Sequence, residues 1–412
     1  MKKFFSQIFP VVLLLSSSTL LFAGGFEPSL TGARQLGMGN TGTALIQGAS
    51  SLLYNPAALV LNDNRFNIHV ATNALWESSV YYDATSGITA RTIDKINYSG
   101  SGYMFFKPVR SVAIGFGVYK PYGINTNWEE PWKGRFVVQN YNFQVTNYQP
   151  TVSVKVSKRL SFGAGLVFSV MKMTFNKDIP LNSVSGKVSA LSLLGKSNGT
   201  TGNLGLFYQA SDRLRLGLTY KAGLRYKITG AQVTTSVPGD LADSYPSANK
   251  FNSSIPLPDV FTVGASYYFT KRFVVSADIS FNQWSVYKEQ YIDFDKNTDL
   301  FKDITFVRKW ENTRSYRFGI QYLKSCCLSF RAGISYDESP VNLNNFLPDI
   351  IEGGQVSFTG GLGYDFNDHW SIDGAAIVSD GTQVEGNYHS IDYRGFYKTR
   401  SFGGVFGLTY VF

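Results

Sequence analysis

The clearest feature of the chain is a strict alternation of side-chain character over residues 160–170. The even positions are apolar and the odd ones mostly small or polar: Leu160, Phe162, Ala164, Leu166, Phe168 and Val170 against Ser161, Gly163, Gly165, Val167 and Ser169. Residues 401–412 repeat the pattern. Because successive side chains of a strand point to opposite faces, both segments predict strands with one apolar face. Their length matches the roughly 9–11 residues that a tilted membrane-spanning strand needs.

The links between such segments distinguish a soluble sandwich from a membrane barrel. Short links are expected at 107–111, 157–159, 211–213, 270–272, 324–327 and 367–369. Long links are expected at 83–97, 123–140, 178–202, 230–257, 294–312, 338–354 and 386–396. This strict alternation joins about fourteen strands with both ends on the short-turn side, unlike the Greek-key links of a sandwich. It predicts an all-β fold, a 14-stranded antiparallel transmembrane β-barrel over residues 64–412.

Composition agrees with a barrel. The chain is 15% aromatic and 16% charged, has 40 glycines, and beyond its first residues has no apolar run long enough for a spanning helix. The formal net charge is +9, or +9 − 2 = +7 without Lys2 and Lys3, but the charges form no basic run, which argues against nucleic-acid binding. The 2 cysteines, Cys326 and Cys327, are adjacent and are expected to be turn residues.

The two ends of the chain carry separate signals. A charged start, an apolar stretch and a small residue at Ala23 predict a secretory signal peptide over residues 1–23. Residues 24–63 are rich in Gly, Ala and Ser and too poor in large apolar side chains to form a core, so they are expected to pack inside the barrel as a hatch, or plug. The last strand ends at Phe412, a terminal aromatic residue that resembles a signal for the outer-membrane insertion machinery.

The chain resembles the FadL/TodX family of outer-membrane transporters for long-chain fatty acids and hydrocarbons. The resemblance covers essentially the whole mature chain and is carried by Asn55-Pro56-Ala57, Gly25-Phe26 and the loop motifs Trp132-Lys133-Gly134-Arg135, Leu257-Pro258-Asp259, Asp337-Glu338-Ser339-Pro340 and Leu347-Pro348-Asp349. It implies a barrel closed by the hatch, a transporter and not an enzyme, that binds a hydrophobic molecule, rearranges its hatch and releases the molecule sideways into the membrane lipid.

The resemblance also implies ligand-binding residues. Phe26 matches a phenylalanine that the family inserts towards its ligand pocket, and Lys177 falls where a basic residue meets the ligand head group. A second basic partner maps near Arg314, where a one-residue slip would reverse the face.

The residues around Lys177 support a pocket independently. Continuing the inward register from residue 169 gives Met171, Met173 and Phe175 before Lys177, an adaptable apolar surface that ends at a cation. The alternative is a bulge after Val170, which would turn the two methionines outwards.

Two further segments are candidates for moving parts. Pro121, Tyr122 and Gly123 interrupt the third strand, where the family has a kink that opens the wall laterally, although Pro121 could instead end the strand. Asn55-Pro56-Ala57 is expected to couple ligand binding to hatch movement, or else to be an ordinary Asn-Pro turn.

The sequence contains little other chemistry. The three histidines are scattered without metal-ligand spacing, no cofactor motif is present, and a monomer is expected. Two alternatives to transport remain open: an outer-membrane lipid-modifying enzyme, and an adhesin or structural barrel with a closed plug.

Overall fold

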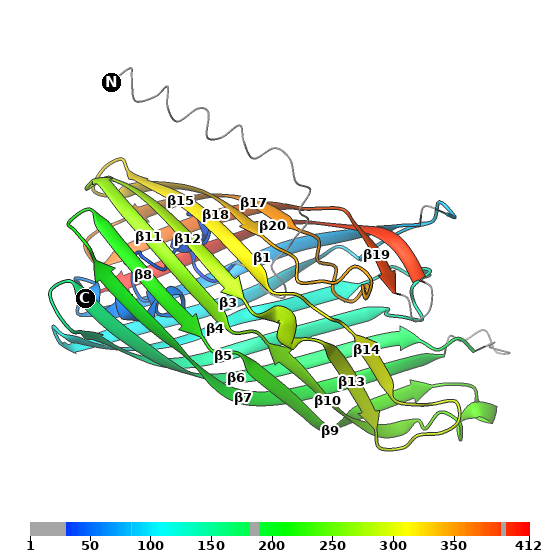
Figure 1. Ribbon diagram of the computed structural model, residues 1–412. Coiled ribbons are helices and arrows are strands. Elements are labelled where there is room, and N and C mark those ends of the chain that lie inside the picture. Colours follow the sequence, from blue (N-terminus) through cyan, green and yellow to red (C-terminus); the bar gives the residue numbers. More distant parts are fainter. Residues whose placement is uncertain (1–29, 84, 182–188, 389–392) are drawn as a thin grey trace.

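The chain folds into a closed antiparallel β-barrel of 14 strands, as the computed structural model shows for residues 30–83, 85–181, 189–388 and 393–412 (Figure 1). The first and last strands close the barrel, with Asn67 opposite Val411. Both the all-β class and the strand number predicted from the links are therefore confirmed.

Nine barrel strands are continuous. They are β1 (Phe66–Tyr82), β3 (Lys95–Val109), β4 (Val112–Asn127), β5 (Asn140–Lys155), β6 (Leu160–Asp178), β7 (Ala190–Gln209), β16 (Leu328–Asp337), β17 (Gln355–Asp365) and β20 (Tyr393–Val411). A short strand, β2 (Thr89–Arg91), pairs only with the end of β1.

The other five barrel strands are each built from two segments. The pairs are β8 (Leu214–Lys221) with β9 (Leu224–Ser236), β10 (Ala248–Leu257) with β11 (Val260–Thr270), β12 (Phe273–Asn282) with β13 (Glu289–Phe294), β14 (Ile304–Val307) with β15 (Thr313–Leu323), and β18 (Trp370–Gly381) with β19 (Val384–Tyr388). Both segments of a pair contact the same neighbouring barrel strand, as β8 and β9 both pair with β7.

The wall shows the alternation that the sequence predicts. On β6 the side chains of Phe162, Leu166 and Phe168 are exposed on the outer face, whereas Ser161 and Ser169 are buried on the inner face. Since the exposed residues are large and apolar, the outer surface suits lipid rather than water.

Several strands extend further than the sequence indicated. β7 begins at Ala190, β9 continues to Ser236 and β10 begins at Ala248, so the links expected at 178–202 and 230–257 are too long. The outward positions of the β7 extension mix polar residues, such as Asn198 and Thr200, with the apolar Leu194, so they do not show the regular apolar pattern of β6. The apolar alternation therefore stops before the strand does.

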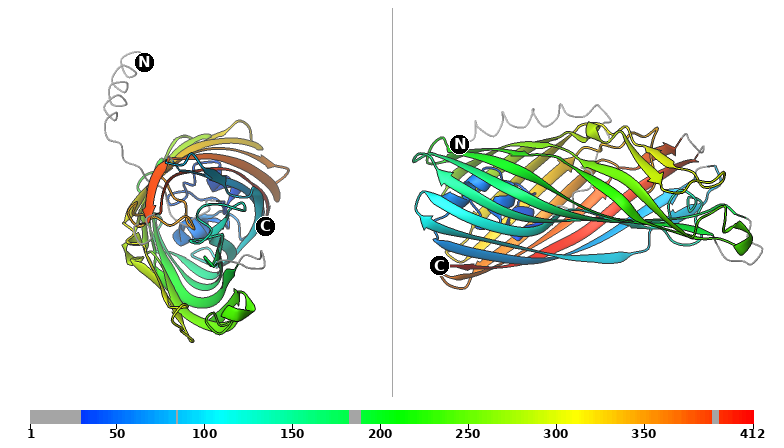
Figure 2. Two further views of the ribbon diagram at one scale, coloured as in Figure 1. Left: turned by 90° about the vertical axis from the view of Figure 1, so that its right-hand side faces the viewer. Right: turned by 90° about the horizontal axis from the view of Figure 1, so that it is seen from below.

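The first described residues lie inside the barrel. Residues 30–62, here called the plug, contain α1 (Ala33–Leu36), α2 (Ser51–Tyr54) and the 3₁₀ helix η2 (Pro56–Leu61). Figure 2 shows these elements within the ring of strands, towards the end at which the C-terminus lies. Two further 3₁₀ helices, η3 (Gly239–Leu241) and η4 (Trp284–Val286), lie outside the plug.

Among the described residues no helix is long and apolar enough to span a membrane. The predicted signal peptide, residues 1–23, lies outside the described residues.

Candidate transport pathway

The Asn55-Pro56-Ala57 motif joins the plug to the barrel wall. The Asn55 side chain accepts a hydrogen bond from the Ala57 backbone N–H at 3.0 Å and so caps η2. Its Nδ2 donates to the backbone oxygen of Thr43 in the plug at 2.7 Å and to that of Leu206 in β7 at 3.0 Å. One buried amide therefore holds two parts of the plug and the wall together.

Glycines line the wall where the plug touches it. These glycines, here called the glycine belt, come from β6, β7, β8, β15 and β16: Gly163, Gly205, Gly217, Gly319 and Gly333. A methyl group built on any of them would overlap plug atoms, namely those of Thr43, Met38, Gly39 or the Asn55-Pro56-Ala57 motif. Because these positions have no side chain, the plug backbone lies directly on the strands.

Two buried carboxylates anchor the plug electrostatically. Asp278 of β12 accepts hydrogen bonds from two successive backbone N–H groups of the plug, at 2.8 and 3.0 Å. Asp373 of β18 pairs with Arg34 of α1 at 2.7 Å and with Arg331 of β16 at 2.7 Å. The plug is thus fixed to two parts of the wall, four barrel strands apart, by contacts that an apolar solute does not replace.

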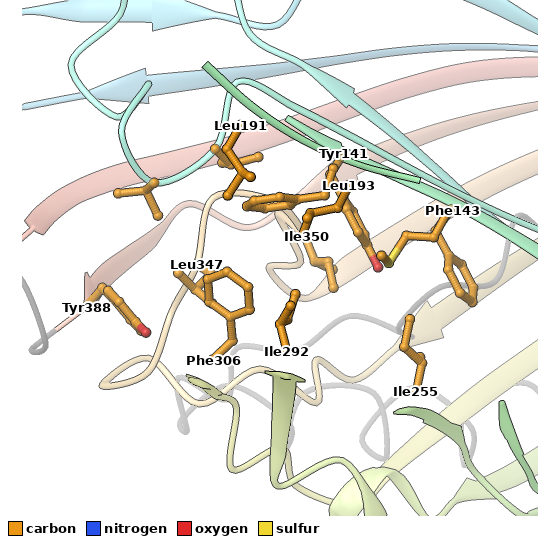
Figure 3. Packing of buried hydrophobic residues seen from close by; sticks show 14 of the residues in the cluster. Tyr141, Phe143, Leu191, Leu193, Ile255, Ile292, Phe306, Leu347, Ile350 and Tyr388 are labelled. Carbon is orange, nitrogen blue, oxygen red and sulfur yellow. The ribbon is translucent and has the colours of Figure 1, made fainter. Parts of the chain in front are cut away.

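The barrel half above the plug, towards the long links, is filled by apolar side chains. This upper cluster includes buried residues of β1, β5, β6, β7, β9, β10, β13, β14, β19, β20 and the 338–354 link. Figure 3 shows some of them packed together: Tyr141, Phe143, Leu193, Ile292, Phe306 and Ile350. Apolar side chains are held by packing and not by directional hydrogen bonds, so they can repack around a guest molecule.

Three of the predicted ligand-binding residues belong to the upper cluster. Met171, Met173 and Phe175 are all buried on the inner face of β6. β6 pairs with β7 from Leu160 to Asp178 without a register shift, so the alternative of a bulge after Val170 is wrong.

The predicted basic residues differ in their placement. Lys177 lies half-buried at the end of β6, and it forms no ion pair with any residue that the structure describes. Arg314 contradicts the expectation of a lumenal partner: it is exposed on the outer face of β15, between the buried Thr313 and Ser315. Phe26 lies outside the described residues.

The sequence did not reveal the basic residue that the upper cluster contains. Arg308, in the break between β14 and β15, forms a bidentate ion pair with Asp349 at 2.8 and 2.5 Å. Its guanidinium also lies 5.6 Å from the ring centre of Tyr287. Asp349 belongs to a motif recognised in the sequence, but its partner is 41 residues away and no local pattern links them. Two desolvated charges are thus held in apolar surroundings by each other.

The wall is incomplete between β3 and β4. The two strands pair from Val109–Val112 up to Gly102–Val118, and beyond that point residues 95–101 and 119–127 form no ladder pairs with each other. This gap is here called the lateral window. Across it the Asn125 Nδ2 donates to Asn97 Oδ1 at 2.9 Å. At its far end the Thr92–Trp128 bridge closes it through two backbone bonds, from the Ile93 N–H to the Asn127 oxygen at 2.7 Å and from the Glu129 N–H to the Arg91 oxygen at 3.0 Å. The Arg91 N–H also donates to the Glu129 carboxylate at 3.0 Å.

A β-bulge lies beside the window. The β4–β5 register shifts between Tyr119 and Tyr122, so Lys120 and Pro121 face a single residue of β5. Tyr119 faces inwards before the bulge, and Tyr122 and Ile124 pack against the upper cluster after it. The alternative that Pro121 ends the strand is wrong, because β4 continues to Asn127.

Two cavities lie beside Tyr122, one in the lumen and one at the window. One of about 60 Å³ lies inside the barrel and is lined by Leu53, Tyr119, Pro121, Tyr122 and Tyr226, among others. A second, of about 110 Å³, lies at the window and is lined by Glu77, Asn97, Tyr122, Gly123 and Asn125, among others. Tyr122 borders both cavities and the upper cluster, so its side chain stands at their junction.

Within the described ranges, no group of three or more His, Cys, Asp or Glu residues could hold a metal ion. Cys326 and Cys327 lie in the short turn between β15 and β16, with their sulfur atoms 3.1 Å apart.

Comparisons with known proteins agree over most of the chain. A family model described as "Outer membrane protein transport protein (OMPP1/FadL/TodX)" matches residues 13–410. The long-chain fatty acid transport protein of Salmonella typhi is 22% identical over 99% of both chains. The putative outer membrane protein NMB0088 of Neisseria meningitidis serogroup B is 23% identical, over 90% of this chain and 89% of its own.

Solved structures share the fold. A Pseudomonas aeruginosa FadL homologue superposes with a TM-score of 0.82 at 19% identity, covering 94% of this chain and 100% of its own. The Ralstonia pickettii toluene transporter TbuX has a TM-score of 0.72 at 18% identity, covering 94% and 99%.

Proposed function

Because the chain belongs to the outer membrane protein transport family (OMPP1/FadL/TodX), we propose that it binds hydrophobic molecules in its upper cluster and releases them through the lateral window. The protein is an outer-membrane transporter, and long-chain fatty acids or related hydrocarbons are its expected cargo. We propose that the protein acts as a monomer and transports its cargo without a chemical reaction. We also propose that the outer-membrane insertion machinery recognises its last strand and the aromatic Phe412 that follows it.

The upper cluster suits the first step. A water-filled pore cannot help a solute that water rejects, since each methylene buried is worth about 0.8 kcal/mol. Met171, Met173 and Phe175 offer such a solute an apolar surface, and methionine adapts readily to irregular shapes. Lys177, at the end of the same face, would meet a carboxylate head group.

The observation that carries the release step is the missing β3–β4 ladder. Within the described part of the chain, the four hydrogen bonds given above close the window, and at roughly 0.5–1.5 kcal/mol each, opening it costs about 2–6 kcal/mol. Passage straight through the barrel would instead require breaking the ion pairs and backbone contacts that fix the plug. A sideways exit is therefore the less costly route.

The plug has a supporting role in this proposal. Residues 24–63 act as a hatch that closes the lumen below the cluster, and Asn55-Pro56-Ala57 transmits small shifts of η2 to β7 through the Asn55–Leu206 hydrogen bond. Pro121, Tyr122 and Gly123 form the movable side of the window.

Uptake by a deletion strain tests the function. Cells carrying the wild-type protein should take up oleate and toluene faster than cells without it. Lys177→Ala should weaken oleate binding about tenfold or more, the worth of one charge-assisted hydrogen bond, and leave toluene uptake unchanged. Lys172→Ala, a lysine on the outer face of the same strand, is the matched control. Equal uptake of both compounds with and without the protein would exclude transport of either.

A further inference from the structure

The outer face of the barrel carries a cluster of cations on three neighbouring barrel strands. Lys172 of β6, Lys196 of β7 and Lys227 and Arg225 of β9 are all exposed and alternate with buried residues that face the lumen. Lys172 and Lys196 are direct cross-strand partners. Lys227 adjoins them, because its backbone oxygen accepts a hydrogen bond from Ser197 at 2.6 Å.

This arrangement is electrostatically unfavourable for the protein alone. Directly opposed residues have Cβ atoms about 4.5–5.5 Å apart, and like charges in such pairs destabilise a sheet. In β5 to β9 the sequence contains a single carboxylate, Asp178, which lies at the end of β6 and pairs with Arg135. The four cations therefore have no carboxylate partner on these strands.

Elsewhere on the outer face, a carboxylate of the protein neutralises two neighbouring cations. Lys398 and Arg400 of β20 are also neighbouring outward cations, but Asp380 of β18 pairs with both, at 3.0 and 2.9 Å. Among the residues that the structure describes, no carboxylate pairs with the β6–β9 cluster, which indicates that its counter-ion comes from outside the protein.

The position of the cation cluster on the barrel indicates where its counter-ion comes from. Below Lys172, the outward residues of β6 from Phe162 to Val170 are apolar. Lys172 is thus the first charge above the apolar belt on this strand, on the side of the long links, which in outer-membrane barrels face the exterior. Lipid head groups of the outer leaflet lie at this height, and basic residues there contact their phosphates.

We propose that Lys172, Lys196, Lys227 and Arg225 form a docking site for the phosphate groups of a phosphorylated glycolipid of the outer leaflet. Phosphate oxygens between Lys172 and Lys196 would replace their repulsion by two attractions. The site lies on the outside of the wall, so it does not depend on which cargo the lumen carries.

The test measures lipid binding by the purified full-length protein in detergent, by native mass spectrometry and by the shift in unfolding temperature. The probes are bisphosphorylated lipid A, its dephosphorylated form and phosphatidylglycerol. The variant is Lys172→Gln/Lys196→Gln, and the matched control is Lys398→Gln/Arg400→Gln, which also removes two outward cations.

Bisphosphorylated lipid A should bind and stabilise the wild type and the control, and it should bind the Lys172→Gln/Lys196→Gln variant about tenfold more weakly or worse. Binding to the wild type should weaken as salt is added. Equal binding of dephosphorylated lipid A, equal binding of phosphatidylglycerol, or an equal loss in the control would each overturn the proposal. If the double variant does not fold, Arg225→Gln/Lys227→Gln replaces it, with the same expected loss.

Discussion

At the scale of single residues, the account depends on buried polar side chains that connect the plug and the wall. Asn55 makes three hydrogen bonds from one amide, to Ala57, Thr43 and Leu206, and it is fully buried. A buried hydrogen-bond partner left unsatisfied costs about 1–3 kcal/mol, so a side chain that satisfies several groups has a large local effect.

Asn55→Ala should loosen the plug without unfolding the barrel. The substitution removes the cap of η2 and leaves two buried carbonyl groups without their donor, at a cost of about 2–4 kcal/mol. We expect larger ion conductance across planar bilayers and greater sensitivity of cells to a hydrophilic antibiotic. Asn62→Ala is the control, because the Asn62 side chain bonds only within the plug. The same conductance for both variants as for the wild type would contradict this role of Asn55.

At the scale of elements, the contact between plug and strands depends on glycines in the wall, whose lack of a side chain lets the plug backbone approach. The glycine belt comes from five strands, and each member faces plug atoms that a methyl group would overlap. Shape complementarity of this kind positions the plug at one height in the lumen, because backbone lies against backbone and neither can move aside.

Gly217→Ala and Gly319→Ala should therefore displace the plug. The added methyl groups would overlap the backbone oxygens of Thr43 and Met38, and overpacking of this kind costs about 1–3 kcal/mol. We expect faster proteolysis of the plug and increased conductance in each variant. Gly360→Ala is the control, since a Cβ there would have no atom within 4 Å. A control as permeable as the two variants would show that the belt does not position the plug.

At the scale of the whole molecule, the sequence was sufficient for the architecture but not for the interior. Alternation and link lengths predicted fourteen strands, because lipid on one face imposes a strict period of two. The same logic failed for β7 and β10, because both strands continue through residues that show no apolar alternation. It failed too for Arg314, because near a strand end a one-residue difference in register decides which face a residue occupies.

The candidate pathway was predictable in part. The inward positions of Met171, Met173 and Phe175 followed from continuing one register along β6. The bulge beside Pro121 and the Arg308–Asp349 pair did not follow, since both depend on contacts between segments distant in sequence. A proline in the sequence marks a point where strand pairing is weakened. Whether the strand ends there, or continues past a bulge with its inward and outward positions swapped, depends on the neighbouring strands.

Release through the lateral window is the central claim, and a reversible cross-link across the window tests it most directly. Asn97 and Asn125 hydrogen-bond across the window at 2.9 Å, so cysteines at both positions would join β3 to β4 when oxidised. The native Cys326 and Cys327 are first replaced by serine, as they lie in a distant turn. The control is Ser357→Cys/Ser379→Cys, which joins β17 to β18 inside a continuous ladder.

The measurement is the rate of uptake of oleate or toluene by cells before and after oxidation, and again after reduction. The account predicts that oxidation of the Asn97→Cys/Asn125→Cys protein stops uptake and that reduction restores it, while the control pair transports at the same rate in both states. Undiminished uptake through a window shown to be fully cross-linked would contradict lateral release.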